Sequence, residues 1–270
     1  MVVFMISFCV IAQDEVVTEN DTSKVNSDAS ASDSSVVLTD TLSMQVDSNF
    51  EAPPPPLDNK LEGSRVYRNF DEALLYAENV FKLDLSNREV DSIPMSISAF
   101  TNLNILNLGN NNISVIPSQI ENLSNLGMLY LDNNSLSEVP SGLDKLINLK
   151  CLDLGNNEIS SLPGEVYQLS NLQWLILRNN KMSSVSSDIA GLANVKKLYL
   201  DGNGISSLPA ELGSLKELQV LSLSNNNLSS IPDELSSLKN LRSINLKGNK
   251  LSGDEIEKVK SWFPKAEVIL

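Results

Sequence analysis

The chain has no histidine among its 270 residues and only two cysteines, Cys9 and Cys151. Without imidazoles, it cannot form a Ser-His-Asp triad, a histidine-ligated zinc site or an imidazole general base. A cysteine without a histidine also lacks the base expected in a thiol protease. We therefore predict that the chain is not an enzyme and has no catalytic residues, cofactor or metal site.

Positive charge is also scarce, because 34 acidic residues outnumber 20 basic ones and give a net charge of −14. A nucleic-acid partner is therefore not expected. Long apolar runs are missing as well. Residues 1–12 are apolar but too short to span a bilayer, so no transmembrane segment is predicted.

Eight consecutive copies of a 23-residue pattern fill the chain from Val80 nearly to its end. Each copy reads roughly LxxLxLxxNxLxxLPxxIxxLxN, as in LKCLDLGNNEISSLPGEVYQLSN at residues 149–171. The copies begin at Val80, Leu103, Leu126, Leu149, Leu172, Val195, Leu218 and Leu241. A fixed period of this length predicts a solenoid, in which each coil contacts only its neighbours.

Positions 4 and 6 of each copy predict a short strand. They hold Leu in every copy except for Ile244, and a spacing of two puts both on one face of a strand. Positions 3, 5 and 7 should then face the other way, into solvent. Strands of successive copies are expected to stack in parallel, with the rest of each copy as the crossover.

Position 9 is Asn in seven copies, and Arg88 replaces it in the first. The chain turns there, which would otherwise bury unpaired backbone groups, and an amide side chain carries both donors and an acceptor. We therefore expect each Asn to bridge neighbouring turns. Position 15 is Pro in six copies, with Ser186 and Glu255 in the others, and Pro favours the start of a short helical or extended segment.

This pattern resembles that of leucine-rich repeat proteins of the 23-residue class, which includes the Ras-scaffold and plant-disease-resistance-like repeats. The resemblance covers residue 80 to about residue 251. It implies an α/β solenoid: a right-handed horseshoe with a parallel sheet on its concave face, short helical or extended segments on its convex face, and helical caps at both ends. It also implies ligand binding on the concave face, but it names no ligand.

The two ends depart from the repeat. Residues 61–79 are expected to form an N-terminal cap, with a short helix after Asn69. The repeats span residues 80–252, and the last copy is partial. Residues 253–270 are expected to form a C-terminal cap with a helix from Asp254 and a final strand at 266–270, which resembles the ending of many secreted bacterial leucine-rich repeat proteins.

The first sixty residues have a different character. Residues 1–12 resemble the end of a secretory signal peptide, with Val10 and Ala12 at the cleavage site, although a basic start is missing. Residues 13–60 contain ten acidic residues and two lysines, and they should form a disordered linker because they cannot bury enough apolar surface. We expect export to the periplasm, cell surface or medium, with a cytoplasmic location as the alternative.

The register also predicts a ligand-binding patch in the middle of the concave face. Adjacent strands lie about 4.8 Å apart, so aromatic, aliphatic and charged side chains of neighbouring copies should form one exposed patch, like an interface core with a polar rim. The predicted binding residues are Met128, Tyr130, Asp132, Cys151, Asp153, Trp174, Ile176, Arg178, Lys197, Tyr199, Asp201 and Val220.

Two alternatives apply to this patch. Apolar residues at position 3 could simply pack along the sheet, which explains Val220 more easily than Trp174. The carboxylates of Asp132, Asp153 and Asp201 could hold calcium, but Arg178 lies one strand away from Asp153 and Asp201, which favours ion pairs.

The sequence therefore predicts a monomeric, non-enzymatic binding module for a protein, peptide or glycan of unknown identity. The first alternative is an intracellular signalling scaffold of the Ras-associated leucine-rich repeat type. The second is a structural surface protein.

Overall fold

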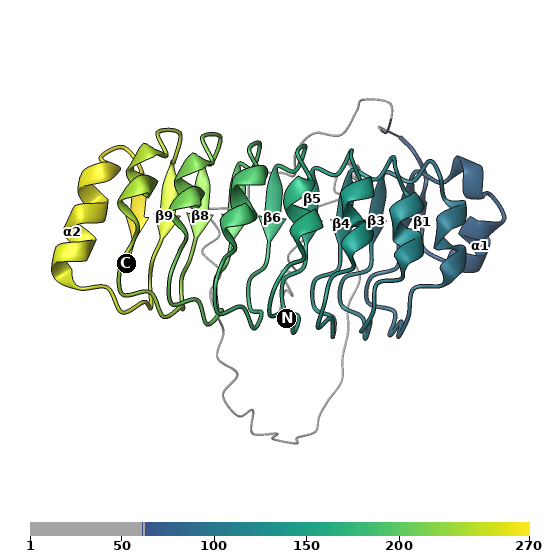
Figure 1. Cartoon of the computed structure of the whole chain (residues 1–270). Coiled ribbons are helices and arrows are strands. Elements are labelled where there is room, and N and C mark those ends of the chain that lie inside the picture. Colours follow the sequence, from purple (N-terminus) through teal and green to yellow (C-terminus); the bar gives the residue numbers. More distant parts are fainter. Residues whose placement is uncertain (1–60, 62) are drawn as a thin grey trace, which may run out of the picture. The chain divides into compact units, whose positions relative to one another are not determined.

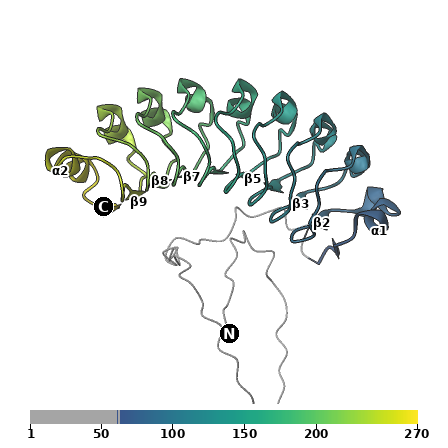
Figure 2. The same cartoon turned by 90° about the horizontal axis from the view of Figure 1, so that it is seen from below.

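A computed structural model describes Leu61 and residues 63–270. The predicted signal peptide (residues 1–12) and acidic linker (residues 13–60) lie outside the described residues. The described residues form a curved solenoid with strands along its inner side and helical segments along its outer side (Figure 2).

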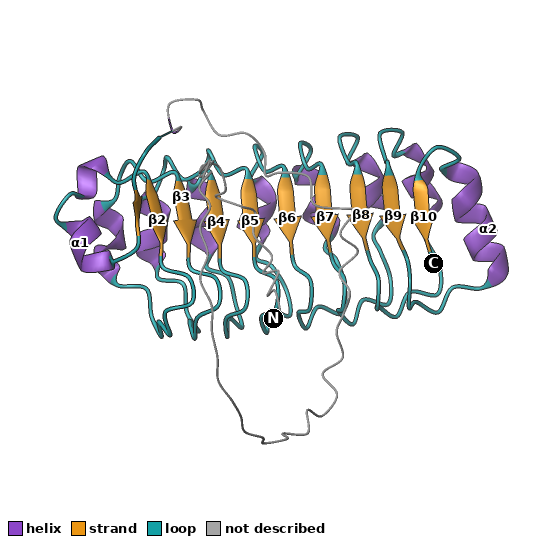
Figure 3. Cartoon of the chain, turned by 180° about the vertical axis from the view of Figure 1, so that it is seen from behind, coloured by secondary structure: helices purple, strands orange, loops and turns teal. Residues whose placement is uncertain are grey.

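The inner side is one parallel sheet of ten strands in chain order, seen face-on in Figure 3. In each repeat the strand covers positions 3 to 5, and its residues pair with the same positions of the next copy. The strands are β1 (Val66–Tyr67), β2 (Lys82–Asp84), β3 (Ile105–Asn107), β4 (Met128–Tyr130), β5 (Cys151–Asp153), β6 (Trp174–Ile176), β7 (Lys197–Tyr199), β8 (Val220–Ser222), β9 (Ser243–Asn245) and β10 (Glu267–Ile269). The predicted sheet and register are confirmed.

Seven short 3-10 helices of five residues each cover the outer side of the repeats (Figure 1). They are η3 (Met95–Ala99), η4 (Ser118–Asn122), η5 (Ser141–Lys145), η6 (Gly164–Gln168), η7 (Ser187–Gly191), η8 (Ala210–Ser214) and η9 (Asp233–Ser237). The residue at position 15 lies just before each of these helices and has an extended backbone conformation. The fixed φ of proline suits this conformation. Where Ser186 replaces proline, its Oγ accepts a hydrogen bond from the Asp188 N–H at 3.1 Å.

The leucines of positions 4 and 6 form the core together with the apolar residues of the outer side. Leu152, Leu154 and Ile159 of the fourth copy, for example, are fully buried in one continuous hydrophobic cluster. Because one coil is too thin to bury these side chains alone, each coil depends on its neighbours.

The asparagines of position 9 form the predicted ladder between coils. Asn157 Oδ1 accepts from the Leu136 N–H at 2.9 Å, and its Nδ2 donates to the carbonyls of Leu131 at 2.9 Å and Leu154 at 3.0 Å. The amide thus satisfies backbone groups of its own coil and of the preceding coil. The same arrangement recurs at Asn111, Asn134, Asn180, Asn203, Asn226 and Asn249.

A second ladder of asparagines, at position 23, had no predicted role. Asn171 Nδ2 donates to the Ile147 carbonyl of the preceding coil at 2.7 Å. Equivalent bonds come from Asn102, Asn125, Asn148, Asn194 and Asn240. Glu217 interrupts this ladder, because a carboxylate has no N–H to donate.

Position 8 is the point where the chain takes a left-handed conformation after each strand. It is Asn in six copies, for example Asn156 with a φ of 53°, and glycine in the other two. Asn tolerates this region better than most residues, and glycine has no Cβ to oppose it. At Gly202 a side chain would also collide with the Asn179 carboxamide of the neighbouring coil.

The N-terminal end contains the expected cap helix and one strand that was not predicted. Helix α1 (Phe70–Leu74) follows Asn69, whose Oδ1 accepts from the Glu72 N–H at 2.9 Å. A 3-10 turn, η2 (Ala77–Asn79), leads into the first repeat. Strand β1 pairs in parallel with β2. Its two residues are too few for the alternation of apolar and polar side chains that reveals a strand in sequence.

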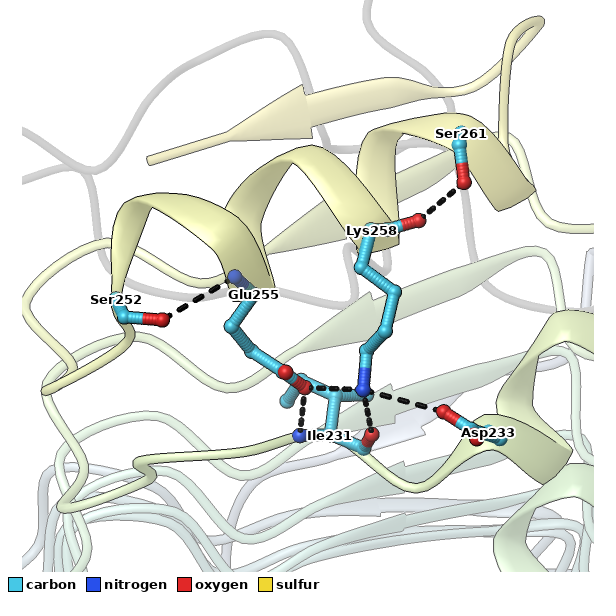
Figure 4. A network of polar contacts seen from close by, with 6 residues as sticks. All are labelled: Ile231, Asp233, Ser252, Glu255, Lys258 and Ser261. Carbon is cyan, nitrogen blue, oxygen red and sulfur yellow. Dashed lines mark hydrogen bonds and ion pairs between the residues drawn. The ribbon is translucent and has the colours of Figure 1, made fainter.

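The C-terminal end closes on helix α2 (Gly253–Trp262) and strand β10, as expected. The helix begins one residue before the predicted Asp254, because Ser252 is the residue that caps it. In the last copy Glu255 occupies the proline position, and its carboxylate accepts from the Ile231 N–H at 2.6 Å while it pairs with Lys258 at 2.7 Å (Figure 4). Lys258 also reaches Asp233 at 3.1 Å, so α2 is joined to the preceding coil by charged contacts.

We predict that Asn157→Ala lowers the free energy of unfolding by about 1–3 kcal/mol, because it leaves buried backbone groups of two coils without partners. Arg88→Ala is the control, because only the backbone N–H of Arg88 contacts the ladder. Chemical denaturation of both variants is the measurement. Equal losses would contradict the role given to position 9.

Candidate binding face

The predicted binding residues lie together on the concave side of strands β4–β8, at positions 3, 5 and 7. The apolar ones are not part of the hydrophobic core, which is on the other side of the sheet. Pairing places Trp174 beside Lys197 and Ile176 beside Tyr199. We call the twelve predicted residues the central face.

The expectation of an exposed patch is wrong for most of the apolar members of the central face. Met128, Tyr130, Cys151, Trp174 and Ile176 have exposed fractions between 0 % and 8 %. Neighbouring side chains account for part of this, since strands about 4.8 Å apart bring them into contact. Tyr130 Oη, for example, donates to Met128 Sδ at 3.1 Å within strand β4.

The two cations of the central face lie against aromatic rings. Lys197 Nζ is 4.0 Å from the centroid of the Trp174 ring, and Arg178 Cζ is 5.7 Å from that of Tyr199. Such contacts between a cation and the face of an aromatic ring are attractive. Strands β6 and β7 therefore combine positive charge and aromatic surface at one place.

The ion pairs of Arg178 with Asp153 and Asp201 stay a prediction, and the Arg178 guanidinium acts to lower the pKa of Asp153. Asp201 Oδ1 accepts hydrogen bonds from the Ser222 hydroxyl and from the Ser224 N–H at 3.1 Å and hydroxyl at 2.7 Å. The sequence signal for this cluster is an Asp at position 7 of one copy followed by serines at positions 5 and 7 of the next copy. The sequence analysis did not identify it.

Asp153 caps the end of its own strand. Its Oδ1 accepts from the Gly155 N–H at 2.9 Å, two residues further on. Asp and Asn side chains commonly close such turns. The same bond occurs wherever position 5 is Asp or Asn, at Asp84, Asn107, Asp153 and Asn245. This position therefore has a structural use that the predicted role in binding did not include.

Two glycines at position 7 make room for charged side chains of the next strand. A Cβ at Gly109 would lie 2.5 Å from Asp132 Oδ1, and one at Gly155 would lie 3.0 Å from Arg178 Cγ. Asp132 and Arg178 therefore lean across the preceding strand. The sequence signal is the pair of glycines, each followed one copy later by a charged residue.

Burial first, and the negative charge of Asp132 second, raise the pKa of Asp153 to about 7. The Arg178 guanidinium and the Gly155 N–H act in the opposite direction. Burial also raises the pKa of Asp132, against the hydrogen bond from Asn133. The two carboxyl groups therefore compete for ionisation in the middle of the face.

The described residues contain no group of three or more Cys, Asp or Glu side chains placed to hold a metal ion. The calcium alternative for Asp132, Asp153 and Asp201 thus gains no support. No helix in the same part of the chain is both long and apolar enough to cross a membrane.

We predict that Asp153→Asn stabilises the protein at neutral and alkaline pH. An acid with a raised pKa in the folded state contributes most below its unfolded pKa, near 4, and this contribution is lost as the pH rises through about 7. Asn keeps the turn, as Asn107 does, but cannot ionise. The gain in unfolding free energy should grow between pH 4 and pH 7 to the order of 1–4 kcal/mol.

Denaturation of both proteins across this pH range is the measurement. Asp84→Asn is the matched control, since Asp84 closes the same turn in the first repeat. If the gain in unfolding free energy of Asp153→Asn is the same at every pH, the raised pKa of Asp153 is contradicted.

Comparison with known proteins agrees with this architecture. The family described as "Leucine rich repeat" matches residues 78–136, and the one described as "Leucine-rich repeat region" matches residues 137–261. No curated protein matches the sequence.

Several solved structures are similar to the chain. A leucine-rich repeat protein of Leptospira interrogans is 40 % identical over 70 % of this chain and 48 % of its own, with a TM-score of 0.68. An internalin of Listeria monocytogenes is 25 % identical over 72 % of this chain and 56 % of its own, with a TM-score of 0.64.

The leucine-rich repeat ectodomain of the plant receptor kinase GASSHO1 from Arabidopsis thaliana was solved in complex with CASPARIAN STRIP INTEGRITY FACTOR 2. It is 29 % identical over 72 % of this chain and 24 % of its own, with a TM-score of 0.65. The chain thus spans between 24 % and 56 % of the length of these three structures. From its repeats, its parallel sheet and these similarities, the chain belongs to the leucine-rich repeat family.

Proposed function

We propose that this chain is a non-enzymatic binding module that recognises a protein or peptide through the central face. The observation that carries the proposal is the group of Met128, Tyr130, Trp174, Ile176 and Tyr199 on the side of the sheet away from the core. These side chains lie outside the hydrophobic core, and interfaces are rich in Trp, Tyr and Met.

The charged members of the central face support the same proposal. Lys197 and Arg178 lie against aromatic rings, and the Asp132 carboxylate occupies the space left by the missing side chain of Gly109. Both signs of charge therefore border the apolar group. An apolar centre with a charged border is the usual composition of a protein interface. A glycan is the second candidate ligand, because aromatic rings and amides also suit sugars. Against it, the plant ectodomain among the similar structures was solved in complex with CASPARIAN STRIP INTEGRITY FACTOR 2.

Export is part of this proposal. Residues 1–12 resemble the end of a signal peptide, and an internalin and a plant receptor ectodomain are among the similar structures. The alternatives are an intracellular scaffold and a structural surface protein. A structural protein should self-assemble when purified, whereas a binding module should remain monomeric.

We expect the protein to be found outside the cytoplasm, with a mature chain that starts at Gln13, after the predicted cleavage site. Cell fractionation followed by mass spectrometry of the N-terminal peptide is the measurement. A cytoplasmic chain that retains residues 1–12 would favour the scaffold alternative.

We predict that Trp174→Ala weakens binding of the natural partner by about 2 kcal/mol or more, because it removes the largest aromatic anchor of the central face. The partner is first recovered by affinity capture with the full chain, and binding is then measured by calorimetry. Trp174 lies outside the core, so thermal stability should fall less than in Leu175→Ala, whose side chain is fully buried in the core.

Glu165→Ala and Gln168→Ala on the outer segment η6 are the matched surface controls, and they should leave affinity unchanged. Loss of binding in these two variants, with full binding in Trp174→Ala, would place the site on the convex side. Unfolding of Trp174→Ala to the same extent as Leu175→Ala would show that the ring is part of the fold instead.

A further inference from the structure

A row of long polar side chains borders the central face, at position 2 of five successive coils, just before strands β5–β9. We call it the basic row; its members are Lys150, Gln173, Lys196, Gln219 and Arg242. The backbone groups of the row are bonded directly to one another. The Gln173 N–H donates to the Lys150 carbonyl at 2.9 Å, Lys196 to Gln173 at 2.7 Å, Gln219 to Lys196 at 2.8 Å and Arg242 to Gln219 at 2.8 Å.

Cations and amides alternate along the basic row. Because neighbouring strands lie about 4.8 Å apart, Lys150, Lys196 and Arg242 follow one another at intervals of about 10 Å, over a total of about 19 Å. Gln173 and Gln219 fill the places between them. All five side chains are partly or fully exposed.

The basic row differs in charge from the rest of this acidic chain. No acidic residue occurs at positions 1, 2 or 3 of any copy, whereas Lys197 adds a further positive charge beside Lys196. The outer segments η4–η9, in contrast, carry seven acidic residues and one lysine. The solenoid therefore has a basic edge along its inner side and an acidic outer side.

Ion pairing within the protein does not account for the charges of Lys196 and Arg242. None of the ion pairs within 4.0 Å among the described residues involves Lys196 or Arg242. Lys181 on the opposite edge, in contrast, pairs with Glu158 at 2.8 Å.

We propose that the basic row binds an acidic, extended segment of a polypeptide partner, with acidic side chains at every third residue. The inference rests on the proposed function and adds the chemistry of the ligand. A polyproline-II chain has three residues per turn and rises about 3.1 Å per residue, so carboxylates at i, i+3 and i+6 lie on one side over about 19 Å. This length matches the separation of about 19 Å that four strand spacings give between Lys150 and Arg242.

The amides of the row fit the same ligand. A polyproline-II backbone has no internal hydrogen bonds, so its carbonyl groups remain free to accept from side chains. Gln173 and Gln219 lie between the cations, where such a backbone would pass, and their amide N–H groups can donate to it. Trp174 of the central face adjoins the row at position 3.

The test uses the full chain and fluorescence anisotropy with two labelled peptides of equal composition, Glu-Pro-Pro-Glu-Pro-Pro-Glu and Pro-Pro-Glu-Glu-Glu-Pro-Pro. The first should bind several-fold more tightly, and added salt should weaken it, because screening reduces exposed charge contacts. The same peptide with Lys in place of Glu should not bind.

Lys196→Gln and Arg242→Gln should each weaken binding of the first peptide by about two- to fivefold. Glutamine is the residue that alternate coils already carry at this position, so the fold should tolerate both changes. Lys181→Gln is the matched control, and it should leave the affinity unchanged because it lies on the other edge.

Equal affinity for the two peptides, or binding that both row variants retain, would overturn the inference. Row-dependent binding of a linear polyuronate, with no binding of either peptide, would overturn it as well and indicate an anionic polysaccharide instead. If the natural partner depends on Trp174 but not on the basic row, this inference fails while the proposed function stands.

Discussion

The bridging asparagine of position 9 is the interaction on which the rest of the structure depends. Each coil leaves backbone groups at the turn after its strand that cannot be paired within the coil, and burial makes unpaired groups costly. One amide completes the hydrogen bonds of two coils at once. The stacking of coils, the parallel sheet and the continuous core all require this closure at every turn.

The fold assigns its structural tasks to certain positions of the repeat, and this explains why the side chains on the concave face can vary. Leucines fill the interior, asparagines at positions 8, 9 and 23 shape and join the turns, and proline or serine starts each outer segment. Positions 2, 3, 5 and 7 take no part in these tasks apart from the turn made by Asp or Asn at position 5. Side chains as different as Trp174, Cys151 and Lys197 therefore occupy equivalent places on identical backbone.

The periodic part of the fold could be predicted from sequence because each of its features recurs every 23 residues. The strands, the core leucines, the Asn157-type ladder and the capping helices all follow from such patterns or from local capping signals. The contacts of the central face could not be predicted in this way. The spacing does not show that Arg178 lies against the ring of Tyr199, that Asp153 closes its own turn or that Asp201 accepts from two serines. Such choices depend on side-chain direction, and spacing alone does not reveal it.

The C-terminal cap has a consequence for how an array of this kind can change in length. Glu255 and Lys258 connect α2 to the Ile231 backbone and to Asp233, both in the coil directly before the cap. Any internal coil offers the same backbone to both neighbours. Whole repeats can therefore be duplicated or lost in the interior by recombination without disturbing either end, and each such event would lengthen or shorten the concave face by one strand.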